Sequence, residues 1–298
     1  MNASKGCFTP EPSQCLGILQ GEMQSVVSVA ADHWTAELRA SSAPALEVRH
    51  VNGFLVLSGE PFPSTPPAGW DLLIAHANFA GLLKFCATPD GALSLRAEIP
   101  LEAGSNLACR LGQACRAFAA ALNWPPDATS GPNPAAPEMA LPDLAKLVEE
   151  AGWQSSSRRG DHCAVPLASR QGTHTALVTM REEMIRVYTE LGSWESLTAT
   201  SREALSALLL TANGELKLAR ASIVEDESGG VAQLEVLLQA PVGAAELRCA
   251  LEALSVGADL CAAVTDILQH EAAAKLFLAI RGGPRVREDS QQTTERRL

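Results

Sequence analysis

The residues best suited to chemistry in this sequence are a histidine and a cysteine that lie side by side. Asp161, His162 and Cys163 place a thiol next to an imidazole, the two groups of a Cys–His nucleophilic pair. Such a pair must face each other, whereas neighbouring residues of a strand point to opposite faces. His270-Glu271 begins like a zinc-protease helix, but the second histidine of that motif is missing. We therefore predict no catalytic residue, no metal site and no cofactor, and hence no enzyme.

The cysteines are spread along the chain and do not form metal-binding or redox pairs. No Cys-x-x-Cys occurs, and the eight cysteines lie at positions 7, 15, 86, 109, 115, 163, 249 and 261. Several stand in apolar stretches, where cysteine behaves as a small buried hydrophobic residue. Cys109 and Cys249 occupy matching places near the start of an apolar helix. We interpret them as core residues and not as a redox switch, in a reducing cytoplasm.

Composition and charge exclude several classes of protein. The 298 residues are 47% hydrophobic and 19% charged, which is typical of a globular chain with room for two domains. The formal net charge of −11 disfavours a sequence-independent grip on nucleic acid. We expect no membrane span, because no uncharged apolar run is long enough, and no signal peptide at residues 1–14. These expectations favour a cytoplasmic protein.

One pattern of segments occurs twice, which predicts a tandem repeat. The matching segments are 72–78 with 207–213, 92–100 with 231–241, and 107–111 with 247–251. Six prolines lie within 124–142, between the two copies, and proline removes a backbone donor and blocks helices. We therefore predict a first copy over 1–124, a Pro-rich linker over 125–141, a second copy over 142–280 and a polar tail over 281–298.

Each copy has the pattern of an α+β unit with the element order α-β-β-β-α-β-β-α. We expect antiparallel sheets with helices on one face, because half-buried strands alternate apolar and polar residues. Asn52-Gly53 predicts a tight hairpin. Whether residues 15–31 form the first helix stays open, because Gly17 and Gly21 weaken it. The predicted strands are 34–39, 46–51, 54–58, 82–88, 92–99, 164–168, 175–180, 184–191, 219–225 and 231–239, and the later helices are 69–78, 104–123, 142–151, 201–213 and one from 244.

This order resembles the fold shared by class I type III secretion chaperones and YbjN-type proteins. The resemblance rests on an apolar pair followed by asparagine at the end of the middle helix, and on a hairpin that ends in proline. These residues are Leu73-Ile74 with Asn78, Leu208-Leu209 with Asn213, Ile99-Pro100 and Ala240-Pro241. From position alone, we interpret the two asparagines as helix C-caps. The resemblance implies pairing through the middle helix and its adjoining strand, and binding of an extended partner segment.

We therefore expect a non-enzymatic cytoplasmic protein-binding module, similar to a type III secretion chaperone, that acts as a monomeric pseudo-dimer. The alternatives are a YbjN-type regulatory or scaffold protein without a secretion role, and an enzyme with an unrecognised site. The expected partner-binding residues on outer strands are Arg49, Val51, Phe54, Val56, Val178, Met180, Arg186 and Tyr188. The expected contacts within the pseudo-dimer are Leu73, Ile74, Leu205, Leu208 and Leu209.

Overall fold

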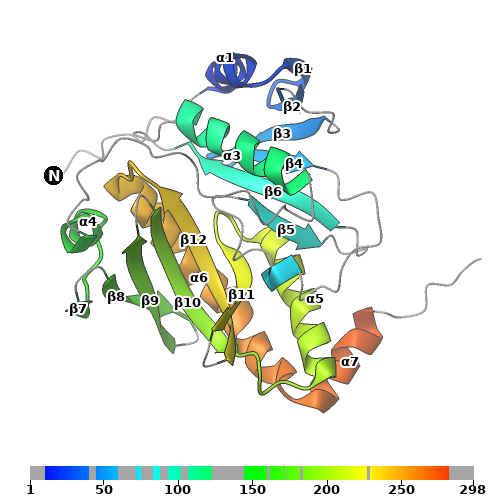
Figure 1. Ribbon diagram of the computed structural model, residues 1–298, viewed down its shortest axis with the longest axis vertical. Helices are drawn as coiled ribbons and strands as arrows, with labels where there is room; N and C mark the ends of the chain where they lie inside the picture. Colours follow the sequence, from blue (N-terminus) through cyan, green and yellow to red (C-terminus); the bar gives the residue numbers. More distant parts are fainter. Residues whose placement is uncertain are drawn as a thin grey trace, which may run out of the picture.

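The structure is a computed structural model that places two antiparallel sheets side by side (Figure 1). It describes residues 11–39, 45–59, 72–74, 83–87, 93–101, 107–122, 144–159, 162–170, 172–181, 184–226 and 229–281. The predicted linker and all of the predicted tail except Arg281 lie outside these ranges. The α+β class with antiparallel sheets is confirmed.

The first half contains helix α1, strands β1 to β6 and helix α3. Their bounds are α1 Pro12–Glu22, β1 Ser25–Ala30, β2 His33–Glu37, β3 Leu46–Val51, β4 Phe54–Gly59, β5 Leu83–Ala87, β6 Leu93–Pro100 and α3 Leu107–Leu122. The predicted hairpin between β3 and β4 is confirmed. Asn52 and Gly53 both have positive φ, 48° and 79°, as a two-residue turn that matches the twist of its strands requires.

The second half contains helices α4 to α7 and strands β7 to β12. Their bounds are α4 Leu144–Glu150, β7 Ser157–Arg159, β8 His162–Ser169, β9 Gly172–Arg181, β10 Met184–Ser193, α5 Ala199–Glu215, β11 Arg220–Asp226, β12 Gly229–Gln239, α6 Ala244–Leu268 and α7 Glu271–Arg281. Thr198 caps α5 by accepting a hydrogen bond from the Ser201 amide at 3.2 Å. Among the described residues, no helix is both long and apolar enough to cross a membrane.

The two sheets have corresponding strand orders, β1-β2-β3-β4-β6-β5 and β7-β8-β9-β10-β12-β11. Each sheet has six strands, so the prediction of three strands before the middle helix was wrong by one strand in each half. The missed strands are β1, which residues 15–31 supply after α1 ends, and β7, which is short and polar. Each pairs with one neighbour in its sheet, β1 with β2 and β7 with β8.

The core is continuous across the two halves. A single cluster of buried apolar residues runs from Cys15 in α1 to Cys261 in α6. Helix α3 contacts β5 and β6, and α6 contacts β8, β9, β10 and β12, so each sheet has a long helix on one face. Helix α5 departs from the prediction because it packs chiefly against β5 of the other sheet, besides β11, α6 and α7. The reason is that β5 is an edge strand whose outer side α5 covers.

Candidate functional site

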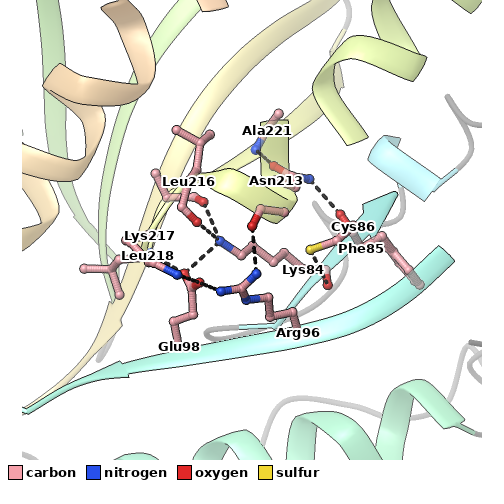
Figure 2. A network of polar contacts seen from close by, with 12 residues as sticks. Lys84, Phe85, Cys86, Arg96, Glu98, Asn213, Leu216, Lys217, Leu218 and Ala221 are labelled. Atoms are coloured by element: carbon pink, nitrogen blue, oxygen red, sulfur yellow. Dashed lines mark hydrogen bonds and ion pairs between the residues drawn. The ribbon is translucent and has the colours of Figure 1, made fainter. Parts of the chain in front are cut away.

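The most unusual site in the described residues is the buried polar contact between the two halves (Figure 2). It forms where edge strand β5 meets the end of α5 and the start of β11. The carbonyl of Leu83 accepts a hydrogen bond from Arg220 at 2.9 Å, and that of Phe85 accepts one from the Asn213 amide at 2.9 Å. An unpaired edge strand otherwise leaves such carbonyls available to other chains. Side chains of the second half therefore close the β5 edge.

A lysine and a glutamate are buried at the centre of this contact. The Lys84 ammonium lies 2.8 Å from the Glu98 carboxylate, and the two side chains are 1% and 0% exposed. Lys84 also donates to the carbonyls of Leu216 at 2.5 Å and Ala219 at 3.2 Å, so all three of its hydrogens have acceptors. Burial lowers the pKa of the Lys84 ammonium, while the Glu98 carboxylate acts in the opposite direction. Because all three N–H groups of Lys84 donate to acceptors, its role in this conformation is to link the two halves.

Glu98 gathers three further donors around its carboxylate. It accepts from the Leu218 amide at 2.6 Å, from Arg96 at 2.9 Å and from Lys217 at 3.5 Å (Figure 2). Leu218 adopts a left-handed backbone with φ of 61°, which costs an ordinary L-residue about 1–2 kcal/mol. The hydrogen bond of the Leu218 amide and the burial of the Leu218 side chain stabilise this conformation. The loop after α5 is thus shaped around the Glu98 carboxylate.

Asn213 joins both sheets and is not a helix cap. Its side chain donates to the Phe85 carbonyl and accepts from the Ala221 amide at 2.6 Å, so it links β5 to β11. The C-cap of α5 is Leu216, three residues further on, so the prediction of a C-cap at Asn213 was wrong. The reason is that the helix continues past Asn213 while the side chain reaches into the contact. Asn78 lies outside the described residues.

A second buried carboxylate, Glu235 on β12, lies next to this contact. It pairs with Arg220 at 2.9 Å and with Arg186 at 2.8 Å. Burial by itself raises the pKa of the Glu235 carboxyl, but the two guanidinium groups outweigh it and hold the pKa below the ordinary 4.5. Arg186 also lies over the Tyr188 ring, 4.5 Å from its centroid. Arg186 and Tyr188, which we predicted to bind a partner, therefore take part in a cluster within the chain.

We expect the stabilising effect of Glu235 to depend on pH. Because its folded-state pKa lies below 4.5, the carboxylate stabilises the fold above pH 4.5, and this contribution is lost as pH falls through the folded-state pKa. Glu235→Gln should lower the free energy of unfolding by about 1–3 kcal/mol at neutral pH, with the difference from wild type shrinking below pH 4.5. Urea titrations across the acid range measure this. Glu190→Gln, at an exposed position of β10, is the control, and a constant difference down to the lowest pH would contradict the prediction.

An arginine in α3 forms the third link between the halves. Arg110 meets the Glu246 carboxylate with two nitrogens, at 2.9 and 3.0 Å. It also donates to the carbonyls of Gln239 and Pro241. Glu246 stands in the first turn of α6, where a carboxylate is favoured by the helix dipole, and it also accepts from the Gly243 amide at 3.2 Å. Arg110 therefore ties α3 to the start of α6.

The other residues predicted to bind a partner are buried, partly buried or exposed. Val178 is fully buried and faces the core, so in this fold it cannot touch a partner, and this prediction was wrong. Val56 is 5% exposed because it lies opposite Glu98 on β6, whose carboxylate the second half covers. Arg49 is exposed and pairs with Glu47. Val51, Phe54 and Met180 are partly buried.

The structure describes the residues predicted to form the pseudo-dimer contact, but only part of one of the two helices in which they lie. Leu73, Leu205 and Leu209 are buried, whereas Ile74 is partly buried. Leu208 packs against a small cluster that includes residues of α7. The predicted meeting of helices 69–78 and 201–213 lies largely outside the described residues, which include only 72–74 of the first helix.

Most of the described thiols are buried, as expected of small hydrophobic residues, and Cys249 is among them, whereas Cys109 and Cys115 are only partly buried. Cys163 is buried while His162, its neighbour on β8, is partly exposed, so their side chains occupy different environments. Burial raises the pKa of Cys86 and Cys115 to about 11 and that of Cys261 to about 12. Such thiols stay protonated at neutral pH and are poor nucleophiles.

Comparison with known proteins adds no relative to this picture. No protein-family model, no curated protein and no solved structure matches the chain. Among the described residues, no group of three or more His, Cys, Asp or Glu side chains is arranged to hold a metal ion. The function therefore has to be argued from the arrangement of the two halves and from the surfaces that they leave open.

Proposed function

We propose that the chain consists of two fused copies of one chaperone-like unit and that it binds another protein without chemistry. The observation that carries this proposal is the corresponding strand order of the two sheets. In each half, a helix precedes four consecutive strands, two further strands follow, and a long helix comes next. The proposal follows the resemblance to class I type III secretion chaperones. In this proposal, the buried contact at β5 joins the two copies within one chain, as a dimer interface joins two separate chains.

The proposed binding face is the part of the first sheet that faces away from α1 and α3. Directly paired residues share a face, so Arg49, His33 and Val56 lie on the same side as Glu98. The second half covers this face at Glu98 and leaves Arg49 exposed. An extended partner segment could lay apolar side chains against such a surface and add hydrogen bonds at its open edge.

Edge strand β1 extends this face with an exposed valine. Val27 is 62% exposed and pairs with Thr35, which in turn pairs with Glu47, so it lies on the Arg49 side of the sheet. Val29 is 58% exposed and stands between Ser28 and Ala30, where the pairing register shifts. Exposed apolar side chains beside an unpaired edge are typical of a surface that a partner covers.

The test is capture of a partner by the full chain from an extract of its native cytoplasm. We expect wild type to retain a specific protein and Arg49→Glu to retain at least about fivefold less, because the reversal places a second carboxylate beside Glu47. Arg116→Glu, at another exposed arginine, on α3, is the matched control. Arg186→Glu is unsuitable, because Arg186 pairs with buried Glu235 and its reversal would destabilise the fold.

Two outcomes would contradict the proposal. Equal capture by wild type and Arg49→Glu, with equal thermal unfolding, would exclude this face as the binding surface. A substrate turnover abolished by His162→Ala or Cys163→Ala would show that the chain is an enzyme. Under the proposal, light scattering should find a single chain per particle, since the two halves already satisfy each other.

A further inference from the structure

Helix α6 carries a second apolar face that the fold leaves open. One side of the helix is buried, with Leu247, Leu251, Leu254 and Cys261 in the core. On the opposite side, large apolar side chains are exposed. Val256 is 64% exposed, Leu260 43% and Ile267 55%. Large apolar side chains gathered on one exposed helix face are typical of a surface that a partner covers.

The exposed residues follow the spacing of a coiled coil. Together with the partly buried alanines at 253 and 263, they repeat at intervals of three and four residues, as alternating a and d positions do. We call Ala253, Val256, Leu260, Ala263 and Ile267 the α6 seam. Ala253, Leu260 and Ile267 take the a positions, and the other two take the d positions. The pattern covers two heptads. A second helix in a coiled coil packs against residues with this spacing.

Acidic residues line one side of the α6 seam. Glu252, Asp259 and Asp266 each precede an a position and are therefore the three consecutive g positions. Each of them already has a contact within the fold. Arg248 lies 4.0 Å from Glu252, the backbone amide of Arg170 donates to Asp259 at 2.6 Å, and Gln269 donates to Asp266 at 3.5 Å. A helix that lies along the seam would meet this acidic row along its length.

The other side of the α6 seam is turned into the fold. The e positions are Gly257 and Val264. A Cβ at Gly257 would lie 2.9 Å from Leu234, so the helix contacts β12 closely there. Val264 packs against the cluster that contains Leu268 and Ala274. A docking helix can therefore be flanked by charge only along the acidic row.

A second copy of the chain does not suit this surface. In an antiparallel pair, the g row of one copy faces the g row of the other, which would bring the acidic rows together. In a parallel pair, g positions face e positions, and the e positions of α6 are covered by its own fold. The chain as a whole carries a formal net charge of −11, which also opposes self-association.

We propose that the α6 seam binds an amphipathic helix of another protein, with Leu, Ile or Val at its own a and d positions and Lys or Arg beside them. The apolar row would provide the buried contact, and the basic residues would face Glu252, Asp259 and Asp266. This surface is separate from the first-sheet face of the proposed function. The failure of either proposal leaves the other standing.

The test uses two synthetic helical peptides of the same length with Leu at every a and d position. One has Lys and the other Glu at its e and g positions. Fluorescence anisotropy with the full chain should show binding of the Lys peptide and at least about tenfold weaker binding of the Glu peptide. Leu260→Glu should abolish binding. Glu252→Lys with Asp266→Lys should reverse the preference between the peptides, and added salt should weaken binding of the Lys peptide to wild type.

Leu276→Glu is the matched control, because Leu276 is an exposed apolar residue on α7 outside the seam. It should bind the Lys peptide as wild type does, and thermal unfolding should be equal for all variants. Equal binding of both peptides, no binding of the Lys peptide, or an unreversed preference in the Glu252→Lys/Asp266→Lys variant would overturn the proposal. A wild-type dimer in light scattering that Leu260→Glu converts to monomer would overturn it too, by showing that a second copy covers the seam.

Discussion

Replacing Glu98 with alanine should lower the free energy of unfolding by about 3–5 kcal/mol. The change leaves the Lys84 ammonium buried with carbonyls alone, and it also removes the acceptor of the Leu218 amide. A buried charge that has lost its partner keeps its desolvation cost and gains no attraction in return. Because the pair joins the two halves, we expect the loss to appear as a shift of the whole urea transition. Circular dichroism during urea titration measures this shift.

Two further variants make this prediction specific to the buried contact. Glu47→Ala removes an exposed carboxylate from the same sheet and should cost no more than about 1 kcal/mol. Lys84→Met with Glu98→Gln replaces both charges by neutral groups of similar size and should recover part of the loss. A Glu98→Ala variant as stable as Glu47→Ala would show that the contact between the halves contributes little to folding.

Replacing Arg110 with alanine should destabilise the fold by a similar amount, about 3–5 kcal/mol. The guanidinium meets Glu246 with two nitrogens and also satisfies the carbonyls of Gln239 and Pro241. Arg110→Lys should recover less than half of the loss, because an ammonium cannot reproduce the forked geometry of the guanidinium. Urea unfolding measures both variants.

Arg116→Ala provides the control for Arg110, since it lies on the same helix and is exposed. Its expected cost is within about 0.5 kcal/mol. The double variant Arg110→Ala with Glu246→Ala should lose less than the sum of the single variants, because each single change leaves a buried charge unpaired. Strict additivity would show that the two side chains do not stabilise each other.

The local structure was largely predictable from the sequence. Alternation at Val178, Met180, Ile185 and Val187, and apolar runs elsewhere, placed the predicted strands, and Asn52-Gly53 placed the β3–β4 hairpin. The buried side of α6 also followed from helical spacing, as Leu247, Leu251 and Leu254 show. These features depend on residues that are near in sequence, so period and turn chemistry suffice to predict them. Strand β7 was missed because its three residues are polar and become a strand only beside β8.

The contact between the halves was decided by the tertiary structure alone. Lys84 and Glu98 alternate with apolar residues in their strands, which is also the pattern of a solvent-facing row. They are buried because the loop after α5, more than a hundred residues away, covers them. The open side of α6 has the same origin, because the helix carries apolar residues on two opposite sides and only packing decides which of them stay exposed. Sequence periodicity tells which residues share a face, and only the packed fold tells what that face meets.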